Sequence, residues 1–216
     1  MSSRAHWERV WSARSPGEFS WHQRHPALSL ELIRATGAGP HTGILDVGGG
    51  ASTLVDYLLA AGFVQVAVLD ISPTALDLAR QRLGERASGV GWLEGDVRCF
   101  VPPHPFDIWH DRAVFHFLTG VEDRAAYRAA LESSLVAGGE AIIATFGPEG
   151  PIRCSGLDVV RYGPEGIASE LGSGFQLVES REERHRTPAG VEQQFVYGRF
   201  RRIEGGIPGD EAQTGR

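Results

Sequence analysis

Three acidic side chains lie at or near the ends of short apolar runs, where strands are expected to end. Asp46 is the last residue but one of the run 43–47, Asp70 ends a second run and Asp96 follows a third. A carboxylate at Asp70 could accept hydrogen bonds from ribose hydroxyls, and one at Asp96 could accept a bond from an adenine amine. Each acid alone is more often a turn or cap residue. Together, at the ends of three successive strands, they predict a nucleoside-binding edge of a sheet.

A glycine cluster of Gly48, Gly49 and Gly50 begins two residues after Asp46. Glycine lets the backbone approach a ligand without a Cβ clash, and the helix that follows such a turn offers free N–H groups. The dinucleotide fingerprint G-x-G-x-x-G would need a third glycine at Thr53, so it is not matched. The cluster indicates either a closely approaching ligand or a tight βα turn that needs unusual backbone angles.

The elements that must position these residues alternate between strand and helix patterns. Five apolar runs predict strands at 43–47, 64–69, 90–93, 106–110 and 141–146. Helical patterns lie between them at 54–61, 73–83 and 123–135, the last ended by two glycines at 138–139. Repeated β-α-β units predict a parallel sheet with helices on both faces and ligands at the carboxyl ends of the strands. Two later runs, 175–179 and 194–200, are joined by too short a connection for a helix and predict an antiparallel hairpin.

Length and composition exclude several classes of protein. The chain of 216 residues suits one domain with a sizeable core, and it has no uninterrupted run of 18 apolar residues that could span a membrane. Its net charge of −6 disfavours a general nucleic-acid binder, which is usually basic. Cys99 and Cys154 are too few for a disulfide framework or a CxxC metal site. The first residues lack a secretory signal, so we expect a cytoplasmic protein without metal, membrane or nucleic-acid partners.

Four motifs resemble the successive motifs of class I S-adenosylmethionine-dependent methyltransferases: ILDVGGGAS, VLDIS, EGDV and FDIWHDRAVFHFL. The resemblance covers about residues 43–202, although Ser52 stands where the family usually has a last glycine. It implies a three-layer α/β, Rossmann-like fold with a mostly parallel seven-stranded sheet, closed by an antiparallel C-terminal hairpin. We divide the chain into an N-terminal helical lid segment (1–40), the methyltransferase domain (41–203) and a disordered tail (204–216).

The resemblance also implies a cofactor, S-adenosyl-L-methionine, with S-adenosyl-L-homocysteine as its product. By their places in the motifs, the glycines would line the methionine part, and Asp46 would support that loop or reach the amino group through water. Asp70 would hold the ribose hydroxyls, with Ile71 stacking on the adenine, while Asp96 and Val97 would contact the adenine amine and ring edge. The expected cofactor-binding residues are Trp21, Asp46, Gly48, Gly49, Gly50, Asp70, Ile71, Asp96, Val97 and Asp111.

Residues after the fourth strand are the candidates for catalysis, because the family places residues facing the transferred methyl group there. Methyl transfer is an in-line displacement in which positioning supplies much of the acceleration. A base is required only where the acceptor is protonated at neutral pH, as a hydroxyl or an ammonium is. His110 and Asp111 are the expected catalytic residues, with His116 as a further candidate. The alternatives are core packing for His116 and a pairing or turn-capping role for Asp111.

Aromatic residues and a cysteine supply two further signals. Trp7, Trp11 and Trp21 precede the first strand, where they could contact a sulfonium by cation–π attraction or lay a helix on the sheet. Cys154, in the loop after the fifth strand, could bind a soft acceptor such as a thiol, or be incidental. The charged stretch 181–186 is expected to be a solvated strand of the hairpin.

Several functions remain open at this level. The leading hypothesis is methyl transfer to a small molecule, such as a thiol or another soft nucleophile, and the alternative within this chemistry is a protein-lysine methyltransferase. An NAD(P)-dependent reductase would share the turn and Asp70, but the chain contains no lysine for the Tyr-x-x-x-Lys pair of that class. A cofactor-binding protein without catalysis is a further possibility. The motif typical of base methylation in nucleic acids is absent from the sequence, which argues against such an acceptor.

Overall fold

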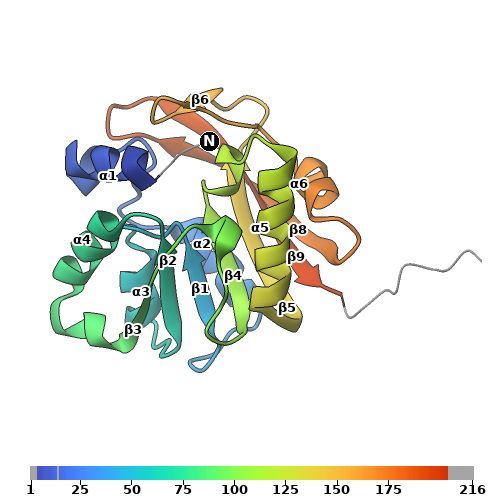
Figure 1. Cartoon of the computed structure of the whole chain (residues 1–216), viewed down its shortest axis with the longest axis horizontal. Coiled ribbons are helices and arrows are strands. Elements are labelled where there is room, and N and C mark those ends of the chain that lie inside the picture. The colour runs from blue at the N-terminus through green and yellow to red at the C-terminus, as the bar shows by residue number, and fades with distance from the viewer. Residues whose placement is uncertain (1–3, 14, 204–216) are drawn as a thin grey trace, which may run out of the picture.

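The computed structural model describes residues 4–13 and 15–203, and a seven-stranded sheet forms its centre. The strands follow the order β3-β2-β1-β4-β5-β9-β8 across the sheet (Figure 1). Their bounds are β1 Ile44–Val47, β2 Val66–Asp70, β3 Val90–Glu94, β4 Phe106–Arg112, β5 Leu135–Phe146, β8 Phe175–Arg186 and β9 Glu192–Arg202. The first five strands are parallel, whereas β9 runs antiparallel to both β5 and β8. The predicted sheet with its closing hairpin is confirmed.

Helices cover both faces of the sheet, which makes the three layers of the predicted fold class (Figure 1). Their bounds are α1 Arg4–Ala13, α2 Ala27–Ala35, α3 Leu54–Ala60, α4 Pro73–Leu83, α5 Val121–Ser134 and α6 Pro164–Leu171. Apolar side chains of α2, α3 and α4 join one core cluster, and those of α5 and α6 join a second cluster on the opposite face. Successive strand residues point to opposite faces, so Ile44 belongs to the first cluster and Leu45 to the second.

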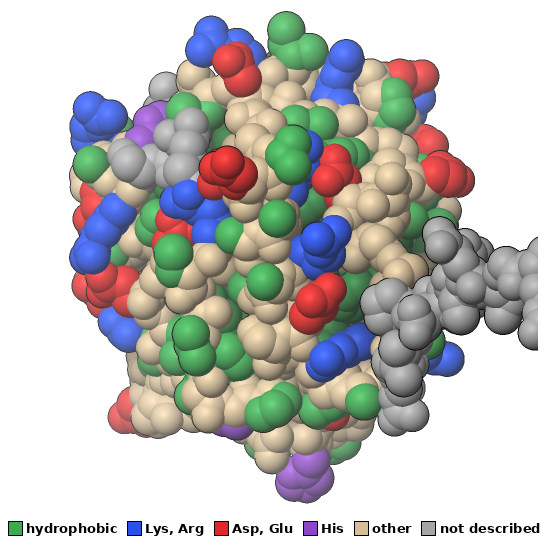
Figure 2. All heavy atoms as spheres, turned by 45° about the vertical axis from the view of Figure 1, so that its right-hand side comes forward, with side chains coloured by type: hydrophobic (Ala, Val, Ile, Leu, Met, Phe, Trp, Pro, Cys, Tyr) green, Lys and Arg blue, Asp and Glu red, His purple; other side chains and the backbone are tan. Residues whose placement is uncertain are grey.

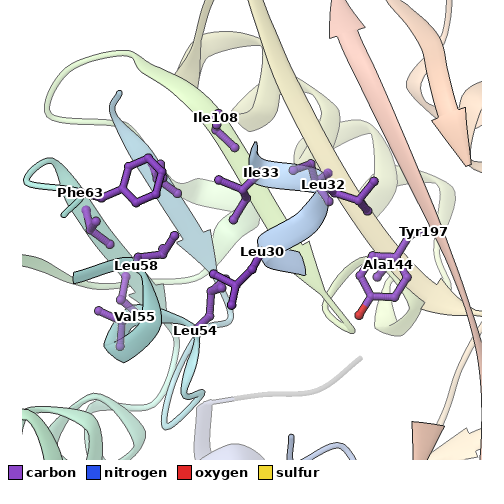
Figure 3. Packing of buried hydrophobic residues seen from close by; sticks show 14 of the residues in the cluster. Leu30, Leu32, Ile33, Leu54, Val55, Leu58, Phe63, Ile108, Ala144 and Tyr197 are labelled. Atoms are coloured by element: carbon purple, nitrogen blue, oxygen red, sulfur yellow. The ribbon is translucent and has the colours of Figure 1, made fainter. Parts of the chain in front are cut away.

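The first cluster shows how two helices attach to one face of the sheet. Leu30 and Ile33 of α2 lie opposite Leu54 and Leu58 of α3, over the strand residue Ile108 (Figure 3). All five are at most 3% exposed. Complete burial of aliphatic side chains of this size stabilises the fold by about 1.5–3 kcal/mol each. The cluster therefore fixes α2, and with it the segment that precedes α2, against the sheet.

The predicted helix near residue 135 ends within one residue of the expected position, but the two glycines do not end it. Helix α5 ends at Ser134, and Leu135 already has extended backbone angles and pairs with Phe106. The next pairing joins Ile108 to Glu140, so β5 inserts extra residues that include Gly138 at φ +74°. The glycines thus form an irregularity inside β5, where a positive φ is needed, and do not cap the helix.

The carboxyl-terminal part contains more structure than its sequence predicts. Both hairpin strands are longer than expected, and the charged stretch 181–186 lies within β8. Helix α6 has no counterpart among the expected elements. The same is true of a short two-stranded ribbon of β6 (Arg153–Cys154) and β7 (Leu157–Asp158).

The expected lid segment contains α1, a short 3-10 turn η1 (Pro16–Glu18) and α2 in its described part. The division of the chain into three parts stays a prediction, and its last part, 204–216, lies outside the described residues. Among the residues that the structure covers, no helix is both long enough and apolar enough to cross a membrane. On the face shown in Figure 2, acidic and basic side chains alternate without a continuous basic area.

Candidate active site

One cavity, which we call the main cavity, opens at the carboxyl ends of β1, β2, β3 and β4, and two walls of different composition enclose it. The first wall, which we call the strand-end wall, consists of Gly48, Asp70, Ile71, Asp96 and Val97. The second, which we call the aromatic wall, consists of Trp7, Trp11, Trp21, Phe117 and Cys154. Strand register produces the first wall, because Val47 pairs with Leu69 and Leu69 with Leu93. The turns that follow these residues therefore meet at one edge of the sheet.

The glycine turn after β1 is crowded by the protein's own side chains. Gly48 has φ +63°, and a Cβ there would lie 2.0 Å from the Cγ2 of Val114. Gly50 has φ +39°, and a Cβ there would lie 2.7 Å from an oxygen of Asp70. Both positions therefore need glycine for conformation and for space. Gly48 lines the main cavity, Gly48 and Gly49 line a second, adjoining cavity, and Gly50 lines neither.

Asp70 ends β2 in a buried position at the edge of the main cavity. One carboxylate oxygen accepts a hydrogen bond from the backbone N–H of Ser72 at 2.8 Å. Burial raises the pKa of Asp70 to about 7, and the nearby carboxylates of Asp46 and Glu8 act in the same direction. A ligand that donates hydrogen bonds to this carboxylate would favour its charged form and lower that pKa again. The site is therefore suited to hydroxyl groups.

Asp96 is held by an arginine that the sequence analysis did not single out. Arg98 donates to it from its backbone N–H at 3.0 Å and from Nε at 2.8 Å, and a second guanidinium contact completes a bidentate pair. Arg98 also pairs with Asp123 of α5 at 3.0 Å. Burial opposes the charge of Asp96, but the bonds from Arg98 keep its pKa below the usual range. The carboxylate is thus a fixed acceptor beside the cavity.

The second cavity lies next to the glycine turn and contains an unpaired carboxylate oxygen. Oδ1 of Asp46 lies 2.7 Å from Nδ1 of His110, whose Nε2 lies 2.9 Å from the hydroxyl of Ser29. Oδ2 of Asp46 is buried and has no hydrogen-bond partner within the described part of the chain. Trp21 and Arg112 also line this cavity. A buried acceptor without a partner is costly, so it fits a donor such as a ligand amino group or water.

The structure does not bring His110 and Asp111 to the main cavity. His110 is turned toward Asp46 and Ser29 and lines the second cavity only. The carboxylate of Asp111 is fully buried, where it accepts bonds from the backbone N–H groups of Val114 and Phe115 and from the hydroxyl of Tyr127. Burial raises the pKa of Asp111 to about 6, against these hydrogen bonds. Asp111 thus holds the loop after β4 in place through these hydrogen bonds.

His116 packs in the core, as the structural alternative proposed. It is buried against the rings of Phe117 and Phe146, and its Nδ1 accepts a hydrogen bond from the backbone N–H of Phe146 at 3.2 Å. Burial lowers the pKa of His116 to about 3, so the ring is neutral. It lines neither cavity described above.

The aromatic wall comes from segments far apart in the chain. The ring of Trp7 meets Trp21 and Phe117 edge-on, with centroids 6.2 and 5.1 Å away. Helix α1, which carries Trp7, is tied to the start of α4 by Glu8, which accepts bonds from the hydroxyls of Ser72 and Thr74. The wall thus depends on how α1 docks, and Phe117 was not among the predicted site residues.

Cys154 of β6 is buried in the aromatic wall. Burial raises the pKa of its thiol to about 11, so the group is uncharged at neutral pH. The sequence analysis also missed Arg112, which lines both cavities at the end of β4. Only its position beside Asp111 could have indicated it.

Comparison with known proteins finds a match to one family model over the part of the chain that carries much of this site. Residues 44–139 match the family model described as a methyltransferase domain. This range contains the glycine turn, Asp70 and Asp96 of the strand-end wall, and also the end of β4. No curated protein matches the sequence.

Solved structures share the fold over most of the chain. One, described as the conversion of a disulfide bond into a thioacetal group during echinomycin biosynthesis, is 21% identical, covers 91% of this chain and 92% of its own, and has a TM-score of 0.75. The N-methyltransferase NodS from Bradyrhizobium japonicum with S-adenosylhomocysteine is 19% identical, covers 94% and 100%, and has a TM-score of 0.70. The 1,6-didemethyltoxoflavin-N1-methyltransferase from Burkholderia thailandensis is 21% identical, covers 90% and 81%, and has a TM-score of 0.65.

Proposed function

We propose that this chain is a class I S-adenosylmethionine-dependent methyltransferase that methylates a small molecule at a soft nucleophilic atom, such as a thiol sulfur. The cofactor is S-adenosylmethionine, whose sulfonium supplies an activated methyl group for in-line displacement. The residues present fit this cofactor in two respects. Gly48 and Gly49 line the second cavity without a side chain, and Asp46, which lines the same cavity, offers a buried oxygen without a partner in the described chain.

We assign the strand-end wall to the nucleoside half of the cofactor and the second cavity to the methionine half. Asp70 would accept bonds from the ribose hydroxyls, and Asp96, held by Arg98, would accept one from the adenine amine. Ile71 and Val97 would contact the faces and edges of the adenine ring. Asp46 would accept from the amino group beside the glycine turn.

The observation that carries the choice of acceptor is the chemistry of the aromatic wall. It contributes four aromatic rings and an uncharged thiol, while the carboxylates that line the cavity belong to the strand-end wall. No imidazole lines this cavity among the described residues. An acceptor that holds its proton firmly at neutral pH, as a hydroxyl or an ammonium does, therefore lacks a base on that side. A small thiol is partly ionised at pH 7, so it can release its proton to water before the thiolate sulfur attacks the methyl group. Positioning and exclusion of water by the aromatic rings would then supply the acceleration.

Two similar structures bear on the acceptor atom. The one described as a disulfide-to-thioacetal conversion concerns sulfur, and NodS is described as an N-methyltransferase. We take the sulfur reaction as support for a soft acceptor in this chain and keep nitrogen, including a lysine side chain, as the alternative that a substrate screen must separate.

The test begins with calorimetric titration of the purified protein with S-adenosylmethionine, S-adenosylhomocysteine and NADPH. We expect saturable binding of the two sulfur ligands and none of NADPH. A panel of small thiols, heterocyclic amines and lysine peptides is then assayed for release of S-adenosylhomocysteine, with the thiols expected to turn over. Binding of NADPH alone would overturn the proposal, and turnover of lysine peptides alone would replace the small molecule by a protein acceptor.

A further inference from the structure

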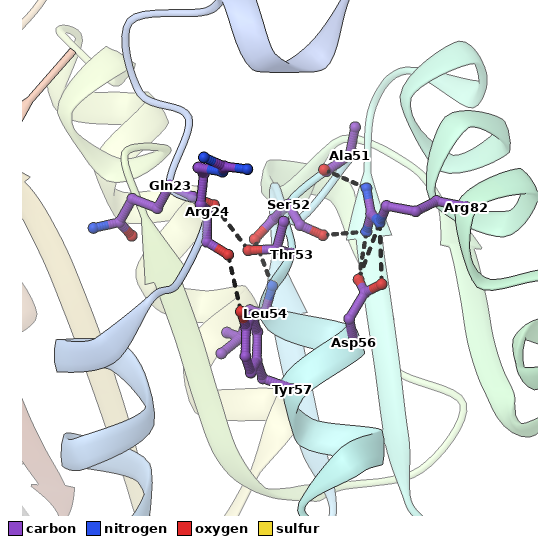
Figure 4. A network of polar contacts seen from close by, with 9 residues as sticks. All are labelled: Gln23, Arg24, Ala51, Ser52, Thr53, Leu54, Asp56, Tyr57 and Arg82. Carbon is purple, nitrogen blue, oxygen red and sulfur yellow. Dashed lines mark hydrogen bonds and ion pairs between the residues drawn. The ribbon is translucent and has the colours of Figure 1, made fainter. Parts of the chain in front are cut away.

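Residues 20–24, which we call the strap, join η1 to α2 and are held largely through their own main-chain carbonyls. Four side chains donate to these carbonyls: His185 to Ser20 at 2.7 Å, Arg112 to Trp21 at 2.9 Å, Thr53 to Gln23 at 2.9 Å and Tyr57 to Arg24 at 3.2 Å. Figure 4 shows the last two bonds, with Thr53 and Tyr57 reaching the strap from α3 and the turn before it. The strap is thus fixed from β4, β8 and the region of α3 together.

Arg112 makes the central contact between the strap and the hairpin of β8 and β9. Its side chain is 10% exposed, and the guanidinium lies over the ring of Phe195 at 4.2 Å. Besides the strap carbonyl, it donates to the hydroxyl of Tyr197 at 2.8 Å and to Glu183 at 3.3 Å. Glu183 in turn accepts from the side-chain amide of Gln23 in the strap at 2.7 Å. Arg112 and Glu183 therefore hold the strap by hydrogen bonds at Trp21 and Gln23.

The hydrogen bonds of the strap lie on the side of the second cavity, although the ring of Trp21 also lines the main cavity. Trp21, His22 and Gln23 line the second cavity, opposite the glycine turn, where the methionine half of the cofactor is assigned. None of the strap bonds described above reaches β2 or β3, whose ends carry Asp70 and Asp96. The nucleoside half of the site is therefore built without the strap's hydrogen bonds.

We propose that Arg112, braced by Glu183, is a positioning residue for the methionine half of the cofactor. It holds the strap, and with it Trp21, over the second cavity, and it leaves the nucleoside half of the site unchanged. This inference rests on the proposed function. Because a hydrogen bond to a charged group is among the stronger ones in a protein, removal of the guanidinium should loosen the strap appreciably.

The same hairpin offers a matched control. Arg199 on β9 is also 10% exposed and pairs with two carboxylates, Glu140 at 2.7 Å and Glu179 at 3.2 Å. It lines neither of the two cavities. Replacement of Arg199 thus removes a buried arginine of similar environment without touching the strap.

The experiment compares two ligands on two variants. S-adenosylhomocysteine carries the methionine half, whereas 5′-methylthioadenosine carries the nucleoside and lacks the amino acid. For Arg112→Met we expect the affinity for S-adenosylhomocysteine to fall by about tenfold or more, and the affinity for methylthioadenosine to change by less than about twofold. Arg199→Met should leave both affinities as in the wild type, and Arg112→Lys should recover part of the loss. Gln23→Leu, at a half-buried surface position, should give a smaller loss with the same selectivity.

Equal losses for both ligands in Arg112→Met and Gln23→Leu would overturn the inference, because they would indicate general damage to the site. An unchanged affinity for S-adenosylhomocysteine in both variants would overturn it as well. A wild-type protein that binds neither ligand would instead overturn the proposed function, and the inference with it.

Discussion

The two walls of the main cavity are held in place by different means. In the strand-end wall, Gly48, Asp70 and Asp96 follow parallel strands directly, so that backbone register sets their positions. In the aromatic wall, Trp7, Trp21 and Phe117 come from α1, the strap and the loop after β4, and side-chain packing sets their positions. The strand-end wall therefore tolerates few substitutions, because its positions depend on the backbone of the sheet. In the aromatic wall, single rings can be replaced while the sheet stays unchanged. A recognition surface for an invariant cofactor and one for a particular acceptor would differ in this way.

The largest effect is expected where the strand-end wall is most crowded. Gly48→Ala places a Cβ against Val114 and forces a positive φ on a side-chain-bearing residue. We expect the free energy of unfolding to fall by about 3 kcal/mol and binding of S-adenosylhomocysteine to be lost in calorimetry. Gly84→Ala is the control, since Gly84 has φ +60° with no neighbouring atom within 4 Å of its Cβ position. It should cost about 1 kcal/mol and leave binding intact. Wild-type affinity in Gly48→Ala would show that the turn is only structural.

A smaller and opposite effect on stability is expected at Asp70. Because burial raises the pKa of Asp70 to about 7, the folded protein without ligand retains a proton that the unfolded chain releases near pH 4. The stability contribution of this group therefore falls as the pH rises from about 4 to about 7. We expect Asp70→Asn to raise the Tm at pH 8 by a few degrees and to weaken S-adenosylhomocysteine binding by about tenfold.

The pH dependence of binding sharpens this prediction. If hydrogen bonds from the ribose favour the charged carboxylate, the affinity of the wild type should rise by about tenfold between pH 6 and pH 8. Asp70→Asn should remove most of that rise. Asp77→Asn, on the exposed face of α4 where Asp77 pairs only with Arg80 in the described contacts, should retain it. The same pH profile in wild type and Asp70→Asn would assign the dependence to another group.

The smallest effect on the cofactor is expected in the aromatic wall. Trp7→Leu removes a ring that lines the main cavity beside Phe117. We expect the affinity for S-adenosylhomocysteine to change by less than about threefold, and the KM for the acceptor found in the screen to rise by about tenfold. Trp92→Leu, on β3 outside both cavities, should change neither quantity. A larger loss for the cofactor than for the acceptor would reverse the roles assigned to the walls.

The difference between the walls also explains what could be predicted from the sequence. The strand-end wall could be predicted from the sequence, because Asp70 and Asp96 each follow an apolar run and the topology of β-α-β units brings the ends of these runs together. The sequence could not show in which direction the side chains at the end of β4 point. A local pattern places His110 and Asp111 at the right end of β4, but their partners Ser29 and Tyr127 lie on helices distant in sequence.

Local sequence patterns could not predict the strap or the aromatic wall, for the same reason. Arg112 lies 91 residues from the carbonyl that it holds, and His185 lies 165 residues from Ser20. The tryptophans before the first strand predicted a covering segment. No local signal indicated that Phe117 joins the wall or that Arg112 and Glu183 hold the strap by hydrogen bonds. Such contacts depend on tertiary packing, which a single sequence does not reveal.

The attachment of the strap through its carbonyls has a consequence for the diversification of this enzyme. Hydrogen bonds to the main chain are indifferent to the side chain at the same position, so most replacements at Trp21 or His22 leave the bonds to Ser20, Trp21, Gln23 and Arg24 in place. A lineage, or a directed-evolution library, can therefore vary these two side chains while the scaffold that presents them stays the same. Because Trp21 also lines the main cavity, a change of that ring could alter the acceptor preference while the main-chain bonds of the strap stay in place.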